Sequence, residues 1–394
     1  MAVMKQQGGR LEQDAFSASR ADGNECPVRM GVVGLGYWGP NLVRVLHESA
    51  VAEAGWMCDL RPEALDSLGQ RFPAVRQTQD FDEMLDDDSL DAVAVVTPVA
   101  THHELAMRAL EAGKHVFVEK PLAPSSDLSI DLMSAAYESG LVLMPGHTFL
   151  YSPPVNRIRD LIRSGELGEI YFISTSRVNL GLHQSDVSVI WDLAPHDFSI
   201  LLYWLEERPT KVVSMGRACL DGGTEDVAFI MCEFDSGTVA HVELSWLAPS
   251  KLRRTTVVGS NKMVVYDDCS NEPVRVYDAG VVPRDPESFG EFLKYRTGDI
   301  VSPHIEGSEP MALQMEDFCR AIRYGTVPRS SAHLGLDVVR MIEAAELSHT
   351  HRSHPCLLEW TDDERARAEG ALHMPEPEGG RGRAAMGAPS SQAV

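Results

Sequence analysis

The sequence predicts an α/β protein in which a doubly wound parallel sheet is followed by an α+β domain with a large open, mostly antiparallel sheet. Three observations predict this fold class. Short apolar segments alternate with helical segments up to about residue 147, and longer segments of alternating polarity follow them. The length of 394 residues allows two domains, because one domain commonly takes about 100–200 residues.

In the first half, each expected strand is short and apolar, and most are followed by a helical segment. The expected strands are residues 28–33, 51–58, 91–96, 115–118 and 141–144, and the expected helices are 41–49, 62–71, 103–112 and 126–139. Gly113 and Gly140 follow the last two helices, where glycine readily adopts the conformation that ends a helix. Such short apolar strands alternating with helices indicate a parallel sheet.

In the second half, the expected strands are longer and more of them are amphipathic. They are residues 169–178, 211–218, 226–234, 238–246, 255–258 and 262–266, and the expected helices are 154–164, 311–324 and 334–349. Val242, Leu244 and Trp246 share one face of their strand, while polar residues share the other, which is typical of a half-buried antiparallel sheet. Because such a sheet has an open face and edges, we expect a helix layer or a partner subunit on it.

The composition excludes several classes of protein. With 35 basic and 58 acidic residues the net charge is −23, so we expect no nucleic-acid partner and no membrane partner. No apolar stretch is long enough to span a bilayer, and the N-terminus lacks the apolar region of a secretory signal. The seven cysteines form no CxxC pair, which favours reduced thiols in a cytoplasmic protein.

Both ends of the chain are polar and lack periodicity. We expect a flexible extension at residues 1–27 and a mostly disordered tail at 361–394, because neither segment contains enough apolar area to order itself. The folded part is therefore expected within residues 28–360.

A glycine-rich sequence follows the first strand and opens the first helix. It places three glycines at the spacing of the dinucleotide-binding fingerprint, around two aromatic residues: Gly34, Gly36, Tyr37, Trp38 and Gly39. Asp59 follows the last glycine by 20 residues, at the end of the second strand, where a carboxylate accepts from the ribose hydroxyls of NAD and repels the 2′-phosphate of NADP. Arg61 could offset this repulsion or stack on the adenine. The alternative is a purely structural glycine turn beside a surface aspartate.

Two further motifs come directly after later strands. Thr97 and Pro98 follow the third strand, with His102 shortly after them, and Glu119-Lys120-Pro121 follows the fourth. Ligands of open α/β sheets bind at the carboxyl ends of the strands. Lys120 is therefore either a site residue or a surface charge, and its position favours a site residue.

A fourth motif, WDLAPHD at residues 191–197, opens a helix of the second half. Asp192 and His196 are four residues apart, so both can face one cleft. A histidine is the usual general base near neutral pH, and a carboxylate can orient it. The alternative is that Asp192 caps the helix and His196 is a packed histidine.

These four elements, in this order, resemble the Gfo/Idh/MocA oxidoreductase family over nearly all of residues 28–360. The resemblance implies an NAD-binding Rossmann domain at 28–147 and a substrate-binding and oligomerisation domain at 148–360. It also implies that Lys120 and His196 are catalytic, with Asp192 as the accompanying acid. The predicted cofactor-binding residues are Gly34, Gly36, Tyr37, Trp38, Gly39, Asp59, Arg61, Thr97, Pro98, His102, Glu119 and Lys120.

Within this family, the sequences around residues 176–179, 191–197 and 245–253 look most like the nucleotide-sugar 3-dehydrogenases, with UDP-N-acetylglucosaminuronate 3-dehydrogenase as the nearest comparison. The resemblance implies NAD-dependent oxidation of a ring alcohol, at C3 of a nucleotide-linked hexose or hexuronate, by a homodimer or homotetramer. A ketone product would suit a pathway aminotransferase. The alternatives are an inositol, free sugar or aminoglycoside dehydrogenase, and a non-catalytic NAD-binding regulator.

An anionic substrate needs a local positive site on a chain of net charge −23. Arg177, Lys251 and Arg253 could supply this charge, helped by Arg254 and with Asn179 nearby as a hydrogen-bonding group. The alternative is that these are ordinary surface cations at a sheet edge. No set of residues has the spacing and acidic companions of a metal site, so we expect no metal.

Overall fold

The computed structural model describes residues 26–181, 187–220, 223–283 and 293–360. Six of the described strands form a parallel sheet in the order β3-β2-β1-β4-β5-β6. Its strands are β1 (Val28–Val33), β2 (Ala52–Cys58), β3 (Arg76–Thr78), β4 (Ala92–Val95), β5 (His115–Glu119) and β6 (Leu143–Gly146). The extension expected at residues 1–27 lies outside the described residues up to residue 25, and the tail expected at 361–394 lies wholly outside them.

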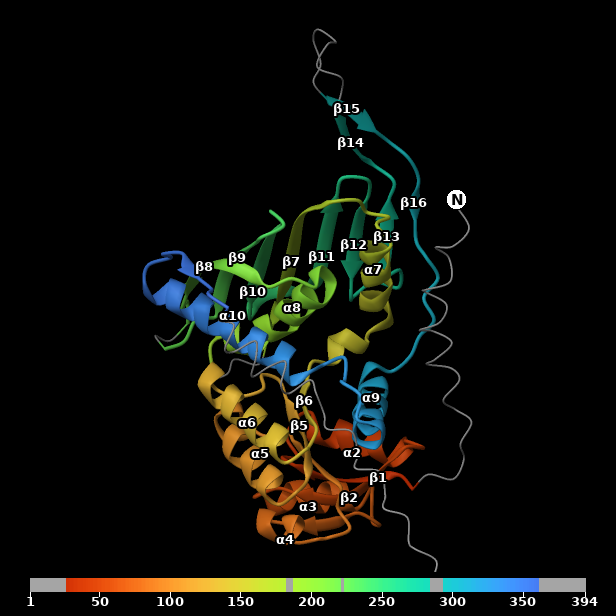
Figure 1. Cartoon of the computed structure of the whole chain (residues 1–394), viewed down its shortest axis with the longest axis vertical. Helices are drawn as coiled ribbons and strands as arrows, with labels where there is room; N and C mark the ends of the chain where they lie inside the picture. Colours follow the sequence, from red (N-terminus) through yellow and green to blue (C-terminus); the bar gives the residue numbers. More distant parts are fainter. Residues whose placement is uncertain (1–25, 182–186, 221–222, 284–292, 361–394) are drawn as a thin grey trace, which may run out of the picture.

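Helices cover both faces of this sheet (Figure 1). They are α2 (Gly39–Glu48), α3 (Pro62–Gly69), α4 (Phe81–Leu85), α5 (His102–Glu111) and α6 (Ser126–Glu138), with a short 3-10 helix η2 (Val99–Thr101) before α5. Alternate residues of β4 enter different cores: Ala92 and Ala94 belong to one apolar cluster, and Val93 and Val95 to the other. The central strand β4 is therefore apolar throughout because both faces of the sheet are buried there.

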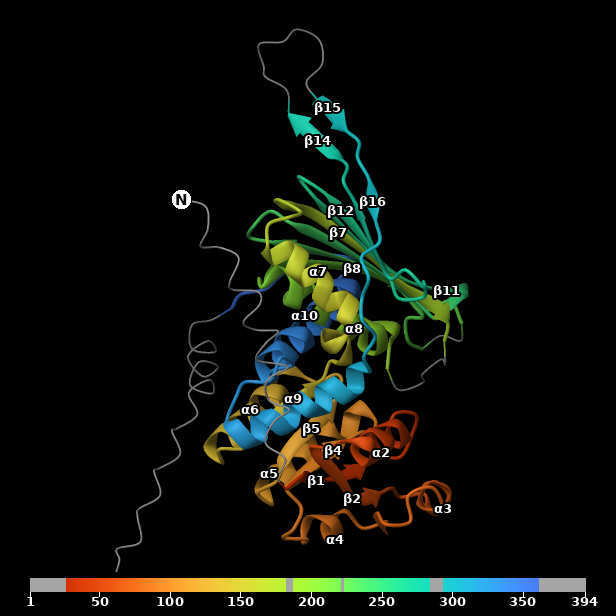
Figure 2. The same ribbon diagram turned by 90° about the vertical axis from the view of Figure 1, so that its right-hand side faces the viewer.

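Nine other described strands form a second sheet in the order β16-β13-β12-β11-β7-β10-β9-β8-β17. Only the β7–β10 pair among its described neighbours is parallel. The strands are β7 (Ile170–Leu180), β8 (Pro209–Arg217), β9 (Val227–Phe234), β10 (Val239–Ser245), β11 (Leu247–Gly259), β12 (Met263–Asp267), β13 (Val274–Tyr277), β16 (Ile300–Val301) and β17 (Cys356–Leu357). A separate hairpin of β14 (Gly280–Pro283) and β15 (Leu293–Arg296) projects beyond this sheet (Figure 2).

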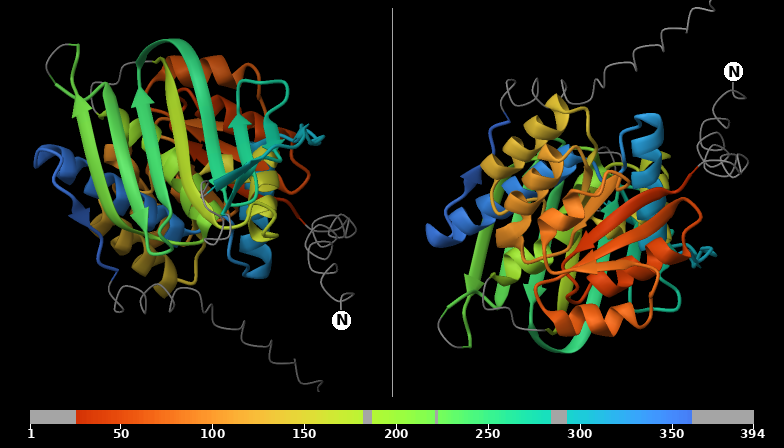
Figure 3. Two further views of the ribbon diagram at one scale, coloured as in Figure 1. Left: turned by 90° about the horizontal axis from the view of Figure 1, so that it is seen from above. Right: turned by 90° about the horizontal axis from the view of Figure 1, so that it is seen from below.

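Helices cover one face of the second sheet and leave the other face open, as the view from above shows (Figure 3). The second half contains η3 (Thr148–Tyr151), α7 (Pro153–Arg163), α8 (Val189–Leu205), α9 (Pro310–Tyr324) and α10 (Ala332–Thr350). Three of these helices, α7, α8 and α10, lie against the sheet. On the open face, Phe229, Met231 and Met215 are each at least 40% exposed and lie on the neighbouring strands β8 and β9.

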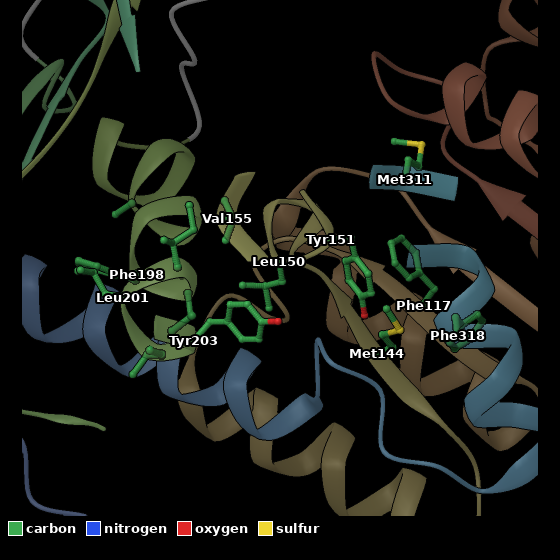
Figure 4. Packing of buried hydrophobic residues seen from close by; sticks show 14 of the residues in the cluster. Phe117, Met144, Leu150, Tyr151, Val155, Phe198, Leu201, Tyr203, Met311 and Phe318 are labelled. Carbon is green, nitrogen blue, oxygen red and sulfur yellow. The ribbon is translucent and has the colours of Figure 1, made fainter. Parts of the chain in front are cut away.

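The last two helices pack against both halves of the chain. α9 contacts α2 and β2 of the first half, and α10 contacts α6 and β6 as well as α8 and β8. The rings of Phe117 on β5 and Phe318 on α9 meet edge to face at 6.1 Å (Figure 4). The polypeptide beyond residue 309 therefore completes the core of the first half.

The expected strands and helices match the main elements, with a few differences. β11 begins at Leu247, eight residues before the expected start at 255. The early part of this strand is rich in exposed lysine and arginine, so its sequence does not look like a half-buried strand, yet Leu252 pairs with Val178 of β7. The short strands β3, β13, β14, β15, β16 and β17 were also not expected, because two to four residues carry little periodicity.

No helix in the described ranges has both the length and the apolar character to cross a bilayer.

Candidate active site

The glycine-rich loop joins β1 to α2, as predicted. A Cβ at Gly34, whose φ is +93°, would lie 2.4 Å from the Val96 carbonyl oxygen, and a Cβ at Gly39 would lie 2.2 Å from the Gly34 oxygen. These two glycines are therefore required by the close packing of the loop itself. Gly36 differs, because a Cβ there would meet no protein atom within 4 Å. Tyr37 and Trp38 are largely exposed, and no side chain caps the N-terminus of α2.

Asp59 lies beneath this loop at the end of β2 and is 8% exposed. Its Oδ2 accepts from the Leu35 N–H at 2.7 Å, and its Oδ1 accepts from the Arg61 N–H at 2.9 Å and Nε at 3.0 Å. Although burial opposes ionisation, the hydrogen bonds from Arg61 and Leu35 lower the pKa of Asp59. The Arg61 guanidinium thus lies on the carboxylate, where it remains 60% exposed to solvent.

His102 connects the carboxyl ends of β4 and β5. Its Nε2 lies 2.8 Å from the Thr97 carbonyl oxygen, and its Nδ1 lies 2.9 Å from the Pro121 carbonyl oxygen. The side chain is 1% exposed. Because its ring nitrogens lie beside these two backbone carbonyl oxygens, His102 holds the segments that carry Thr97 and Lys120 together. The contact between His102 and the cofactor stays a prediction.

Lys120 and Asp192 come from different halves of the chain and meet between the two sheets. The Lys120 Nζ donates to the Asp192 carbonyl oxygen at 2.7 Å and to its Oδ1 at 3.2 Å. The Trp246 Nε1–H donates to the other carboxylate oxygen, Oδ2, at 3.1 Å. The side chains of Lys120 and Asp192 are 13% and 20% exposed. The ammonium is thus held at a fixed place but remains accessible.

His196 lies one turn after Asp192 on α8. Its ring packs edge to face on Phe149 at 5.1 Å, and its buried Nδ1 has no hydrogen-bond partner among the described residues. Burial, with the nearby charges of Lys120 and Arg177, lowers the pKa of His196 well below its usual value. The imidazole is therefore neutral near pH 7 and can accept a proton. The hydrogen bonds of the Asp192 carboxylate go to Lys120 and Trp246.

Arg177 does not have the position expected of an anion-binding group. Its side chain is 5% exposed, and its Nε donates to Asp197 Oδ2 at 2.6 Å, in a buried ion pair beneath the site. The guanidinium also lies 4.7 Å from the Phe149 ring centroid. Thr175 donates to Asp197 Oδ1 at 2.8 Å. The prediction of a free cation at Arg177 is wrong, because Asp197 of α8 already neutralises it.

The remaining predicted substrate residues lie on the edges of the site. Arg253 is the direct cross-strand partner of Arg177, so both face the helix layer, and its Nη1 donates to Asp268 at 3.4 Å. Lys251 is exposed on the same strand, and Asn179 is half-buried near the end of β7. The alternation along β11 directs Arg254 to the opposite, open face of the sheet.

Two family models match the chain. Residues 28–147 match the oxidoreductase family with an NAD-binding Rossmann fold, and residues 155–265 match the GFO/IDH/MocA C-terminal domain. The chain belongs to the Gfo/Idh/MocA oxidoreductase family. It is an NAD-dependent dehydrogenase that acts on CH–OH groups.

Several members of the Gfo/Idh/MocA family are similar over most of their length. The NAD-dependent scyllo-inositol 2-dehydrogenase of Bacillus subtilis (strain 168) is 27% identical over 323 residues, which cover 77% of this chain and 89% of that protein. The UDP-N-acetylglucosamine 3-dehydrogenase of Acidithiobacillus ferrooxidans is 28% identical over 292 residues, which cover 71% of this chain and 87% of that protein. The structure of GenD2 from gentamicin A biosynthesis in complex with NAD superposes with a TM-score of 0.73 at 25% identity, covering 85% of this chain and 97% of that one.

The residues of this family member fit NAD. The open space beside Gly36 and the N-terminus of α2, which no side chain caps, form a place for a pyrophosphate, which the partial positive charge of the helix N-terminus favours. The ionised Asp59 follows β2, where its carboxylate would accept hydrogen bonds from the ribose hydroxyls. When bound, NAD supplies the acceptor for a hydride.

Glu119 is the last residue of β5 and lies beside Lys120. Its Oε2 accepts from the Lys120 backbone N–H at 3.1 Å, and burial raises the pKa of this carboxyl to about 7. A Cβ at Gly146 would lie 3.1 Å from Glu119 Oε1, so the absence of a side chain at Gly146 makes room for this carboxyl. The Glu119 carboxyl is therefore present in both its neutral and its charged form near physiological pH.

Sequence reasoning missed His147 as a site residue. It directly follows β6, is 1% exposed, and neither ring nitrogen has a hydrogen-bond partner within the described ranges. Burial, with the charge of Lys120, lowers its pKa to about 3, so the ring is neutral. Its place at the carboxyl end of a parallel strand was the signal that could have identified it.

Among the residues that the structure describes, no group of three or more histidine, cysteine, aspartate or glutamate side chains is arranged to hold a metal ion.

Proposed function

We propose that this chain oxidises a secondary alcohol on a sugar ring to a ketone. The observation that carries the proposal is the convergence of the Lys120 ammonium, held by Asp192, and the neutral His196 imidazole at the carboxyl edge of the parallel sheet. This edge is where a doubly wound sheet presents its cofactor. The convergence also favours an enzyme over a non-catalytic NAD-binding regulator, since family members of that kind lose the catalytic pair.

The proposed roles follow from the state of each group. The neutral His196 accepts the proton of the substrate hydroxyl as the C–H bond breaks, which is general base catalysis. Lys120 donates a hydrogen bond to the oxygen that develops negative charge. Asp192 keeps the ammonium directed at that place.

The substrate we propose is a nucleotide-linked hexose or hexuronate, oxidised at C3. Arg253 and Lys251 support this proposal, because they lie on β11 beside the site and can donate charge-assisted hydrogen bonds to a diphosphate or a carboxylate. The similarity to UDP-N-acetylglucosamine 3-dehydrogenase, at 28% identity, supports it as well. The ketone product has the chemistry that a pathway aminotransferase consumes.

A second candidate, an aminoglycoside or other cationic ring polyol, gains support from one observation. Arg177 is neutralised by Asp197, so the site carries less positive charge than the sequence suggested. A chain of net charge −23 attracts cations and repels anions at long range. The similarity to GenD2 of gentamicin A biosynthesis is in line with this candidate.

Steady-state assays with NAD test both candidates. We expect turnover of nucleotide-linked sugars with a kcat/KM at least ~10-fold above that of the free sugars, the worth of one charge-assisted hydrogen bond. The panel includes inositols and aminoglycosides, and the appearance of reduced nicotinamide is the signal. A higher kcat/KM for the aminoglycosides would establish the second candidate. Absence of turnover with every polyol, in a protein that binds NAD, would refute the function itself.

A further inference from the structure

We propose that Trp246 is a positioning residue that acts through Asp192 on Lys120, an inference that rests on the proposed function. The two oxygens of the Asp192 carboxylate have different partners. Oδ1 faces the Lys120 Nζ at 3.2 Å, and Oδ2 accepts from the Trp246 indole N–H at 3.1 Å. The indole therefore fixes the side of the carboxylate that Lys120 does not contact.

The chemistry of the indole makes this contact directional. An indole N–H can only donate, whereas a carboxylate can only accept when ionised. The terminal torsion of an aspartate side chain has a broad, two-fold energy profile, so a carboxylate without a second partner rotates easily. With Trp246 on Oδ2, rotation would break a hydrogen bond to a charged group. Oδ1 thus stays directed at the Lys120 ammonium.

The backbone around Trp246 is itself held in place. The residue lies between the end of β10 and the start of β11, where its N–H donates to the Asp226 carbonyl oxygen at 3.0 Å. Its own carbonyl oxygen accepts from the Gly181 N–H at 3.0 Å. A Cβ at Gly181 would lie 2.7 Å from the indole Cδ1, and Trp246 is 3% exposed. The indole therefore has a defined position from which to orient Asp192.

The test removes the N–H donor and keeps an aromatic ring, and a second buried tryptophan given the same change controls for the loss of ring volume. In Trp246→Phe the kcat should fall about tenfold or more, which is the effect expected from the loss of one hydrogen bond to a charged group. The Kd for NAD should stay at the wild-type value. In the Asp192→Ala background the same substitution should have no further effect on kcat, because the carboxylate through which Trp246 acts is gone. Trp204→Phe is the control, since the Trp204 indole N–H donates to the Val155 carbonyl oxygen at 2.9 Å, in the core.

A second readout does not depend on turnover. Lys120 is labelled with an amine-reactive reagent, and the modified peptide is quantified by mass spectrometry. Labelling should be about tenfold faster in Trp246→Phe, because the ammonium loses an oriented partner, and should be unchanged in Trp204→Phe. Accelerated labelling in a protein that turns over no polyol would keep the positioning role and reject the proposed function.

Two results would overturn the inference. One is an unchanged labelling rate of Lys120 in folded Trp246→Phe. The other is an equal loss of kcat in the wild-type and Asp192→Ala backgrounds, which would mean that Trp246 touches the substrate or only supports the fold. If Trp246→Phe does not fold, Gly181→Ala displaces the indole by contact at Cδ1, the carbon next to the N–H, and the same two results would overturn the inference.

Discussion

Replacing Arg177 by methionine decides between two roles for this residue. Sequence reasoning makes it an anion-binding group at the surface, whereas the structure places it in a buried ion pair with Asp197. Methionine keeps much of the apolar volume of the side chain and removes the charge. The structural role predicts a large loss of stability, and the surface role predicts a rise in KM with little change in stability.

The expected loss follows from the environment of the charge that remains. The side chain of Asp197 is 3% exposed, so the variant leaves a carboxylate buried without its cation. Removing one partner of a buried ion pair costs about 3–5 kcal/mol. The Thr175 hydroxyl still donates to Asp197 and offsets part of this, while the loss of the Arg177 contact with the Phe149 ring adds to it. We therefore expect the free energy of unfolding to fall by at least about 3 kcal/mol.

Urea unfolding of the protein without cofactor, followed by circular dichroism and tryptophan fluorescence together, measures this loss. The double variant Arg177→Met, Asp197→Leu should be more stable than Arg177→Met alone, because no unpaired charge remains buried. Wild-type stability of Arg177→Met, together with a raised KM for an anionic substrate, would show that the guanidinium is free in solution and that the ion-pair reasoning is wrong.

Four further predictions concern other parts of the molecule. The kcat/KM of the wild type should be higher with NAD than with NADP, and Asp59→Ser should reduce this ratio at least ~10-fold by removing the charge that repels the 2′-phosphate; an unchanged ratio would exclude Asp59 from cofactor selection. Lys120→Met or His196→Asn should each lower kcat at least ~100-fold with little change in the Kd for NAD, and a variant with full turnover would remove that residue from the mechanism. Because the pKa of His147 is about 3 in the folded protein and about 6.5 when unfolded, unfolding takes up a proton at acid pH, so this site alone should lower stability by about 2 kcal/mol between pH 7 and pH 5; His147→Asn should show correspondingly less loss in urea titrations at the two pH values, and the same loss as wild type would contradict the buried neutral state. If a second subunit covers the open face of the large sheet, Phe229→Asp should lower the mass measured by light scattering to that of a monomer, whereas an unchanged oligomer would place the subunit contact elsewhere.

The sequence was sufficient for the architecture because the fold is encoded by local periodicity. The alternation of short apolar strands with helices predicted the parallel sheet, and the glycine spacing predicted the turn between β1 and α2. Lys120 was predicted as a candidate site residue because it directly follows a strand, and the carboxyl ends of parallel strands meet at one edge of the sheet.

The parts that could not be predicted depend on pairings between distant residues. Alternation along β7 predicts the side of the sheet on which Arg177 lies. It does not predict that Asp197, 20 residues later on α8, forms an ion pair with it. Trp246 and Asp192 are 54 residues apart and meet only because β10 ends beside the start of α8. The sequence predicted that His102 contacts the cofactor. It could not show that the ring nitrogens lie beside the Thr97 and Pro121 carbonyl oxygens.

The return of α9 and α10 to the first half has a consequence for how the chain is made. Leu336 and Val339 of α10 belong to the same buried cluster as β4 and β5, and Phe318 of α9 packs on Phe117. A ribosome that has translated only the first 150 residues has therefore released a sheet whose apolar faces still lack part of their cover. The core of the nucleotide-binding half is therefore complete only when the last helices have emerged, which lengthens the time that its apolar surface is exposed during synthesis.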